Sequence, residues 1–241
     1  MKKTFIIKSG AVEKIIINGR DAGKINIKVG KNSVVDIFDQ GPTLSTGSDP
    51  DLHVKVIAES GSKISWYGVN ENNTSLQVDL LGKKANVAVN ELNIGTVESK
   101  SKRTVLINHI APETQSAFLG FALMQNNSEH NWNVTTTIER KAKKSTANQR
   151  INNLLLGVSG AVKNHLALII RNNDVICTHA VATGHLDEEQ IFYAQARGLT
   201  IKKSKALMAR GFVAPIFKLL PNDLEQELEE KIDYLFHDNA E

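Results

Sequence analysis

The sequence predicts a mainly β protein, with a right-handed parallel β-helix (solenoid) over residues 1–184 and a C-terminal α-helical subdomain over residues 185–241. Three observations predict this arrangement. Short apolar or alternating segments recur from Phe5 to about Ile170. Turns of similar form, each with a glycine, precede several of these segments. After Gly184 the spacing of apolar residues becomes that of helices.

The predicted strands are short runs separated by polar turns that contain glycine or asparagine. They are Phe5–Ile7, Lys14–Ile17, Lys24–Val29, Val34–Phe38, Leu52–Ile57, Lys63–Tyr67, Leu76–Leu80, Ala85–Val89, Thr104–Ile110, Ala117–Leu123, Asn133–Ile138 and Leu166–Ile170. A last strand is predicted at residues 174–180.

Turns of recurring form, each with a glycine, lead into four of these strands. Gly10 and Gly30 lie about 20 residues apart, as do Gly61 and Gly82, and such spacing is typical of solenoid repeats. It suits a solenoid with two or three strands in each coil, because each coil buries its inward face by stacking on the next. Turns at intervals of about 8 to 12 residues also occur in antiparallel sandwiches, so spacing alone leaves that alternative open.

A first helix is predicted to begin at Asp187, which caps it, with Gln190 at the third helical position as in a capping box. Gly198 follows Arg197 and is the usual stop. A second helix is predicted from Lys202 to about Leu219, before Pro221.

A third helix is predicted after an Asn222 cap, with Glu225 closing its capping box and acidic residues in its first turns. Its apolar residues form one stripe: Leu224, Leu228, Ile232 and Leu235. Such a stripe covers either the neighbouring elements of the same chain or a partner.

Composition excludes several classes of protein. The 241 residues contain one cysteine, so no internal disulfide forms, and Lys8 interrupts the first apolar run too early for a signal peptide or membrane span. We therefore expect a cytoplasmic protein without a membrane partner. The net charge is only +3, and the basic run at residues 140–144 contains no aromatic residue, which favours a solvated turn over a nucleic-acid site. Neither P-loop nor GxGxxG motif occurs, so we expect no nucleotide to bind through those loops.

The chemical candidates are Cys177 and His179 on the last predicted strand. Alternation places both on one face, where a metal or sulfur species would contact both. The alternative is a buried cysteine that acts as a small hydrophobic residue. Two side chains do not complete a tetrahedral site, so further ligands would come most economically from a second subunit. His109, His130 and His185 lack the spacing of a metal motif.

Several segments resemble the SufB/SufD family of iron-sulfur cluster assembly scaffolds, and SufD more closely. The resemblance runs through residues 108–116, 118–120, 142–149, 154–156, 174–179, 186–193 and 197–198. It implies the β-helix with its helical subdomain, and a non-enzymatic role. Residues 180–182 depart from the Gly-Ala-Thr that follows the histidine in SufD proteins. Typical members also carry an N-terminal helical region, whereas strands are predicted here almost from Met1.

The resemblance also implies partners. A SufC-type ATPase would dock on the helical subdomain through residues of the matching segment, namely Asp187, Glu188, Gln190, Ile191, Phe192, Tyr193, Arg197 and Gly198. Cys177 and His179 would lie near the contact with a SufB-like scaffold or a second copy of the chain. Iron or an iron-sulfur cluster would be held there transiently and shared between subunits.

Two other classes of function remain open at this stage. A carbohydrate-active β-helix enzyme would need clustered carboxylates and exposed aromatic residues, and aromatic content is only 5%. A structural assembly protein would use its helices only to cap the solenoid. Co-purification with an ATPase would distinguish the scaffold from both.

Overall fold

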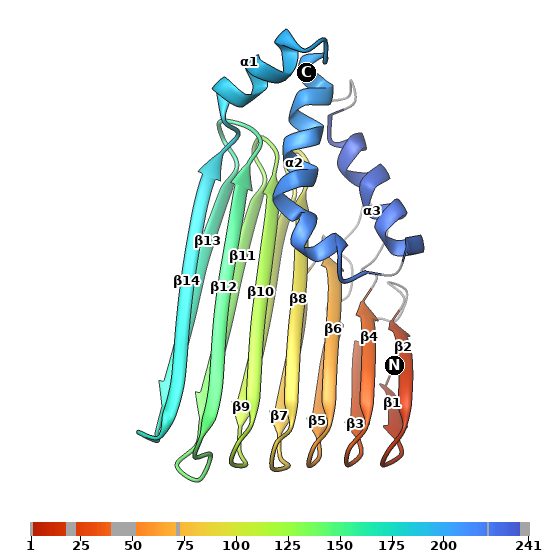
Figure 1. Cartoon of the computed structure of the whole chain (residues 1–241), viewed down its shortest axis with the longest axis vertical. Coiled ribbons are helices and arrows are strands. Elements are labelled where there is room, and N and C mark those ends of the chain that lie inside the picture. The colour runs from red at the N-terminus through yellow and green to blue at the C-terminus, as the bar shows by residue number, and fades with distance from the viewer. Residues whose placement is uncertain (1, 18–22, 40–51, 71–72, 221, 237–241) are drawn as a thin grey trace.

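The structure is a computed structural model that describes residues 2–17, 23–39, 52–70, 73–220 and 222–236. Across these ranges, fourteen strands form two parallel seven-stranded sheets (Figure 1). Sheet A has the strand order β1-β3-β5-β7-β9-β11-β13, and sheet B has the order β14-β12-β10-β8-β6-β4-β2. Each coil therefore contributes one strand to each sheet. The predicted solenoid is confirmed, and the parallel pairing excludes the antiparallel sandwich.

The strands of sheet A are β1 (Lys2–Ile7), β3 (Gly23–Val29), β5 (Leu52–Ala58), β7 (Thr74–Leu80), β9 (Lys100–His109), β11 (Glu129–Ile138) and β13 (Ala161–Ile170). Those of sheet B are β2 (Val12–Ile17), β4 (Val34–Asp39), β6 (Lys63–Asn70), β8 (Asn86–Gly95), β10 (Gln115–Met124), β12 (Ser145–Leu155) and β14 (Val175–His185).

The coil is longer than the glycine spacing predicts, and its length varies along the chain. One coil leads from Lys2 to its partner Lys24, whereas a longer one leads from Lys100 to its partner Glu129. The increase accompanies longer strands, since β1 has 6 residues and β9 has 10. The two glycines of each pair occupy different positions in turns of the same kind. The number of residues between them therefore differs from the length of a coil.

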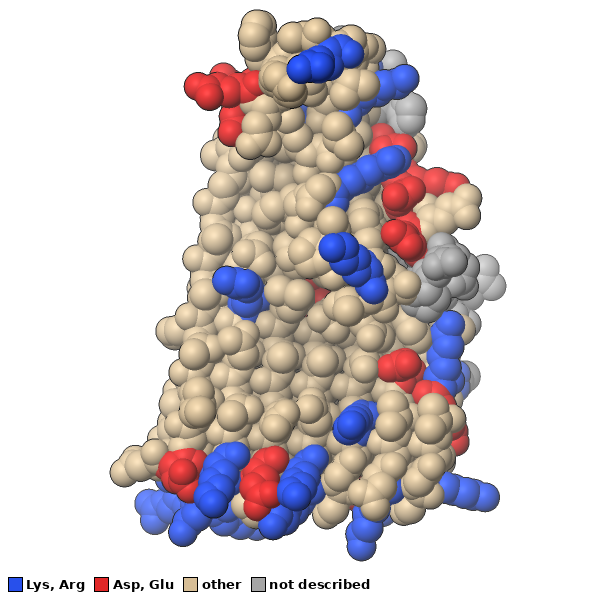
Figure 2. Space-filling view, in the orientation of Figure 1, with Lys and Arg blue, Asp and Glu red and all other residues tan. Residues whose placement is uncertain are grey.

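The turns at the lower end of Figure 1 are stacked by backbone hydrogen bonds from coil to coil. Successive turns place one residue in the left-handed region, among them Gly10, Asn32 and Gly61, with φ of 76°, 55° and 69°. The amide of Asn32 donates to the carbonyl of Ser60 at 2.9 Å, and this pattern repeats along the column. Figure 2 shows charged side chains gathered along this lower edge.

Gly82 occupies the other glycine position of these turns. A Cβ atom at this residue would lie 1.9 Å from the backbone nitrogen of Ser60 in the preceding coil. This turn therefore approaches the preceding one so closely because position 82 lacks a side chain.

Strand β12 was not predicted, and several late strands are longer than predicted. The inward positions of β12 include buried Gln149 and Asn153, so the strand lacks the apolar alternation by which strands are identified. The predicted last strand ends at residue 180, whereas β14 continues to His185.

Three helices follow the strands: α1 (Glu188–Ala196), α2 (Ile201–Phe217) and α3 (Asn222–Tyr234). The predicted start and stop of the first helix are confirmed, because Asp187 accepts from the amides of Glu189 and Gln190, and Gly198 has a φ of 92°. The second helix ends at Phe217 rather than near Leu219.

Helices α2 and α3 pack on the outer face of sheet B, over the upper parts of its longer strands (Figure 1). The shared apolar cluster joins sheet and helix side chains, namely Leu92, Ile94, Phe121, Leu123 and Leu154 with Ala209, Val213, Ile216, Phe217, Leu228, Ile232 and Leu235. The stripe predicted for α3 therefore faces its own chain at Leu228, Ile232 and Leu235. The side chains of Asn222 and Leu224 lie outside the described residues. No helix in the described ranges is long and apolar enough to cross a membrane.

Candidate functional site

The site centres on the inward face of β14, the last strand of sheet B. Cys177 pairs in register with Ala147 of β12, and His179 pairs with Gln149. Because Ala147 and Gln149 are buried inward residues, parallel pairing points Cys177 and His179 the same way. Both predicted residues are therefore together on one inward face.

This face is open in the last coil. The inward residues of β12 are mostly buried between neighbouring coils, but His179 and Val181 of β14 are exposed. Strand β14 pairs with β12 on one edge, and no strand of the described residues pairs with its other edge. The end of the solenoid thus presents inward side chains and a strand edge that the described part of the chain leaves uncovered.

Cys177 is half-buried beside an apolar cluster of Ile138, Ala142 and Ala147. This burial raises the pKa of the Cys177 thiol, and a hydrogen bond with the Ala147 backbone offsets only part of the effect. The thiol is therefore not activated by the chain, and a bound metal ion would have to displace its proton.

Thiolate and imidazole are donors that suit iron and iron-sulfur species. In the described part of the chain, however, no group of three or more His, Cys, Asp or Glu side chains is arranged to hold a metal ion. His185 lies on the same face of β14, but it is six residues, or about 20 Å, beyond His179. Cys177 and His179 are thus ligands of the right chemical type for iron or iron-sulfur species, but they are too few to hold such a species alone.

His109, in the segment that resembles the family's His-x-Ala-x-x-Thr-x-Ser stretch, has a structural role in the interior. Its Nδ1 lies 2.8 Å from Thr114 Oγ1, and its Nε2 lies 2.8 Å from Ser116 Oγ. Thr114 Oγ1 in turn donates to the carbonyl of Ala111 at 3.1 Å and contacts Ser145 Oγ at 2.8 Å. Burial lowers the pKa of His109 to about 4, so the imidazole is neutral near pH 7.

A polar cluster inside the solenoid was missed by the sequence reasoning. Arg103 and Glu91 form an ion pair in which both side chains are at most 2% exposed. Arg103 Nη1 also donates to Thr74 Oγ1 at 2.6 Å. The sequence does hint at this cluster, because Glu91 and Asn93 stand at alternate positions of β8 and therefore lie on the same face of the strand.

A second set of buried polar contacts extends to the open end. His130 Nδ1 lies 2.7 Å from Ser101 Oγ, and burial, with a smaller effect of Arg103, lowers the pKa of His130 to about 3. Trp132 Nε1 donates to Asn153 Oδ1 at 3.2 Å. Asn153 Nδ2 then donates to Asn164 Oδ1 and Thr183 Oγ1. The last of these contacts lies on β14, so the polar interior reaches the open face.

The residues predicted to bind a partner through α1 divide into two groups. Asp187, Gln190 and Gly198 shape the ends of the helix, and Ile191 is buried. The second group is Glu188, Phe192, Tyr193 and Arg197, whose side chains are exposed and do not cap the helix, with Phe192 and Tyr193 exposed by 73% and 61%. Arg197 Nη2 donates to Tyr193 Oη at 2.9 Å. Helix α1 thus presents exposed aromatic side chains that do not contribute to the packing of the helix on the rest of the chain.

Comparison with known proteins identifies a family model over most of the chain. The model described as "SUF system FeS cluster assembly, SufBD core domain" matches residues 20–212. The match begins before β3 and ends within α2, so it covers most of the solenoid and the start of the helical segment.

Curated relatives agree with this match. The iron-sulfur cluster assembly protein SufD of Bacillus subtilis (strain 168) is 28% identical over 66% of this chain and 38% of its own length. SufD of Escherichia coli (strain K12) is 25% identical over 71% of this chain and 40% of its own length. The iron-sulfur cluster assembly SufBD family protein ycf24 of Galdieria sulphuraria is 22% identical over 70% of this chain and 79% of its own length. The chain thus spans about two fifths of the two SufD proteins.

Proposed function

Because this chain belongs to the SufBD family of iron-sulfur cluster assembly proteins, we propose that it is a non-enzymatic scaffold subunit of a Suf-type complex. The observation that carries the proposal is the core-domain match over residues 20–212. In this role the chain docks an ATPase through its helices and shares iron or a nascent cluster, as cargo, with a second subunit. It catalyses no reaction of its own.

The second subunit covers the open end of the solenoid. An exposed inward face and a strand edge that no described strand pairs with favour pairing with another chain, which would supply the missing ladder partners. Cys177 and His179 lie on that face, and their incomplete donor set supports ligands from the other chain. The partner is a SufB-like scaffold or a second copy of this chain.

The ATPase docks on α1. Exposed aromatic side chains and arginine are the residue types that most often dominate binding energy in protein interfaces. Phe192 and Tyr193 are exposed, and Arg197 is held against the Tyr193 ring at 5.1 Å. These three side chains form the proposed docking surface.

Point substitutions test docking better than removal of the helices. Truncation at Leu186 would expose the apolar outer face of sheet B, because α2 and α3 cover Leu92 and Phe121. We therefore propose co-expression with a SufC-type ATPase, comparing wild type with a Phe192→Ala, Tyr193→Ala double variant. Capture should weaken at least about tenfold. Val12→Ala, at an equally exposed apolar residue on β2 at the other end of the solenoid, is the matched control. Undiminished capture by the double variant would contradict the docking assignment.

A separate variant tests cargo handling. His179→Ala should lower the iron or cluster content of the assembled complex while ATPase capture and melting temperature stay unchanged, because His179 is exposed. Cys177→Ser should have a smaller effect, since one thiolate does not hold a cluster. A His179→Ala variant that melts earlier yet carries full cluster content would overturn the assignment and indicate a structural histidine.

A further inference from the structure

The solenoid changes strand length between β7 and β9, and the step leaves a hollow on the outer face of sheet A. Thr74, the first residue of β7, pairs with Arg103, so Lys100, Ser101 and Lys102 of β9 extend past the start of β7. The cavity there has a volume of about 320 Å³. We call it the outer-face hollow; its lining residues are His53, Asn73, Thr74, Ser75, Lys102 and Thr104.

The lining of the hollow is rich in hydrogen-bond donors, and its described residues include no carboxylate. Thr74 is only 5% exposed, and its Oγ1 accepts from the buried Arg103 Nη1 at 2.6 Å, so this hydroxyl is engaged on the interior side and Ser75 supplies the outward-facing hydroxyl of β7. His53 Nδ1 lies 2.5 Å from Ser75 Oγ, so one of these two groups donates to the other. Thr104 and Asn73 add a hydroxyl and an amide.

Lys102 supplies the positive charge of the hollow. Among the described residues no acidic side chain forms an ion pair with it, whereas Lys100 on the same strand lies 3.7 Å from Glu129. Lys55, on strand β5 of the same sheet, is also neutralised, because its Nζ lies 2.9 Å from Asp79 Oδ2. The ammonium group of Lys102 is therefore available to a ligand.

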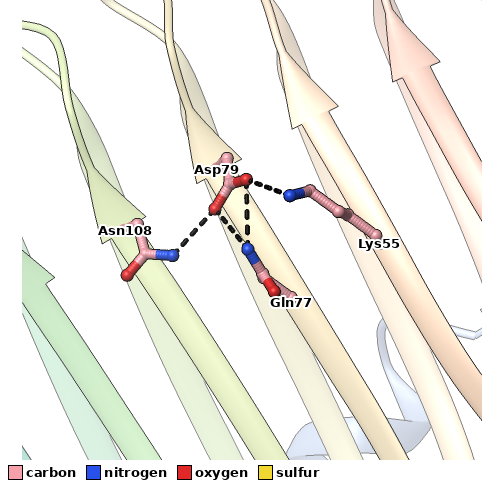
Figure 3. A network of polar contacts seen from close by, with 4 residues as sticks. All are labelled: Lys55, Gln77, Asp79 and Asn108. Carbon is pink, nitrogen blue, oxygen red and sulfur yellow. Dashed lines mark hydrogen bonds and ion pairs between the residues drawn. The ribbon is translucent and has the colours of Figure 1, made fainter.

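The network of Figure 3 keeps Lys55 engaged elsewhere. Asn108 and Gln77 donate to Asp79 at 2.7 and 2.9 Å, and this network lies farther along β5, β7 and β9 than the hollow does (Figure 3). Burial opposes ionisation of Asp79, but the hydrogen bonds and the charge of Lys55 outweigh it and hold the pKa of Asp79 below its usual range. The carboxylate therefore stays charged near neutral pH and retains Lys55.

We propose that the outer-face hollow binds the phosphoryl group of a small anionic molecule. Hydroxyl, amide and ammonium donors that line one hollow, with no carboxylate among its described residues, match an oxyanion with several acceptor oxygens. The cavity volume lies within the range of about 300 to 1,000 Å³ of small-molecule sites and accommodates more than the phosphoryl group alone. The site is independent of the scaffold role, because it involves neither β14 nor α1.

Calorimetric titration of the full chain with inorganic phosphate and with pyrophosphate, at constant ionic strength, tests the proposal. Wild type should bind both saturably. Lys102→Gln should weaken binding about tenfold, because a charge-assisted hydrogen bond is lost. Lys163→Gln removes the same charge from an exposed position on the same sheet face and should leave binding unchanged.

Thr104→Val is a second variant, at a half-buried residue that is not part of the Arg103 network, and it should also weaken binding. Melting curves of each variant confirm folding before titration. Absence of saturable binding to wild type would overturn the proposal, as would equal weakening by Lys102→Gln and Lys163→Gln, which would indicate diffuse attraction to the sheet face. Intact phosphate binding together with failed ATPase capture would count only against the scaffold proposal.

Discussion

Acidification should destabilise the solenoid through the buried imidazole of His109. Its pKa is about 4 in the folded chain and about 6.5 when unfolded, because burial disfavours the charged ring. Between these values the unfolded chain binds the proton and the folded chain does not. Stability from this group is therefore fully present above about pH 6.5 and decreases as pH falls to about 4, below which it changes no further.

The expected magnitude follows from the two pKa values. Each unit of difference corresponds to about 1.4 kcal/mol, so His109 should remove about 3 kcal/mol between pH 7 and pH 4. That is a large fraction of the stability of an ordinary domain. His130, whose pKa is lowered to about 3, should add to the loss in the same direction.

Urea unfolding at several pH values between 7 and 4 measures this effect. A His109→Gln variant should be less stable at pH 7, because it loses a hydrogen bond to Thr114 or Ser116, and its stability should vary with pH by about 3 kcal/mol less than that of wild type. Thr136→Val, which removes a buried hydroxyl that accepts from Gln149 at 2.8 Å but no titratable group, controls for reduced stability alone. If the His109→Gln and wild-type curves run parallel from pH 7 to 4, the reasoning about His109 is wrong.

Three further changes should alter stability in ways that thermal or urea unfolding can measure. Gly82→Ala should cost about 3 kcal/mol, because its Cβ would meet the Ser60 backbone, and a variant as stable as wild type would mean that the turns can separate. Glu91→Gln should cost about 3 to 5 kcal/mol by leaving the Arg103 charge buried without its partner, and a loss below about 1 kcal/mol would show that Arg103 reaches water. Lys144→Gly should raise stability by up to about 1 kcal/mol, since φ at this position is 56°, and an unchanged or lower melting temperature would contradict that.

The helix ends and most strands could be predicted from the sequence because their causes are local. Asp187 caps α1 through amides two and three residues away, and Gly198 ends it through its own backbone conformation. The apolar alternation of β3 and β5 likewise depends on neighbours in the same strand. Strand β12 lacked this local signal, since its inward residues Gln149 and Asn153 find partners on other strands.

The site could be predicted only in part. Alternation alone placed Cys177 and His179 on one face of a strand, and the family resemblance singled out the same pair. That the face is open, and that Cys177 lies beside Ala147, depends on pairing with β12 in the preceding coil. The same holds for His109, whose partner Thr114 contacts Ser145 in the next coil.

The strand-rich body, the helical end of the chain and the shared face of Cys177 and His179 follow from local sequence patterns, because alternation, capping and glycine turns act over a few residues. The parallel order of the two sheets, the buried ion pair of Arg103 with Glu91 and the packing of α2 and α3 on sheet B depend on contacts between distant parts of the chain. The physical reason is that burial in a solenoid comes from residues one full coil away, and the coil length itself changes along the chain. No local sequence pattern predicts which residues of the neighbouring coil will bury a given side chain.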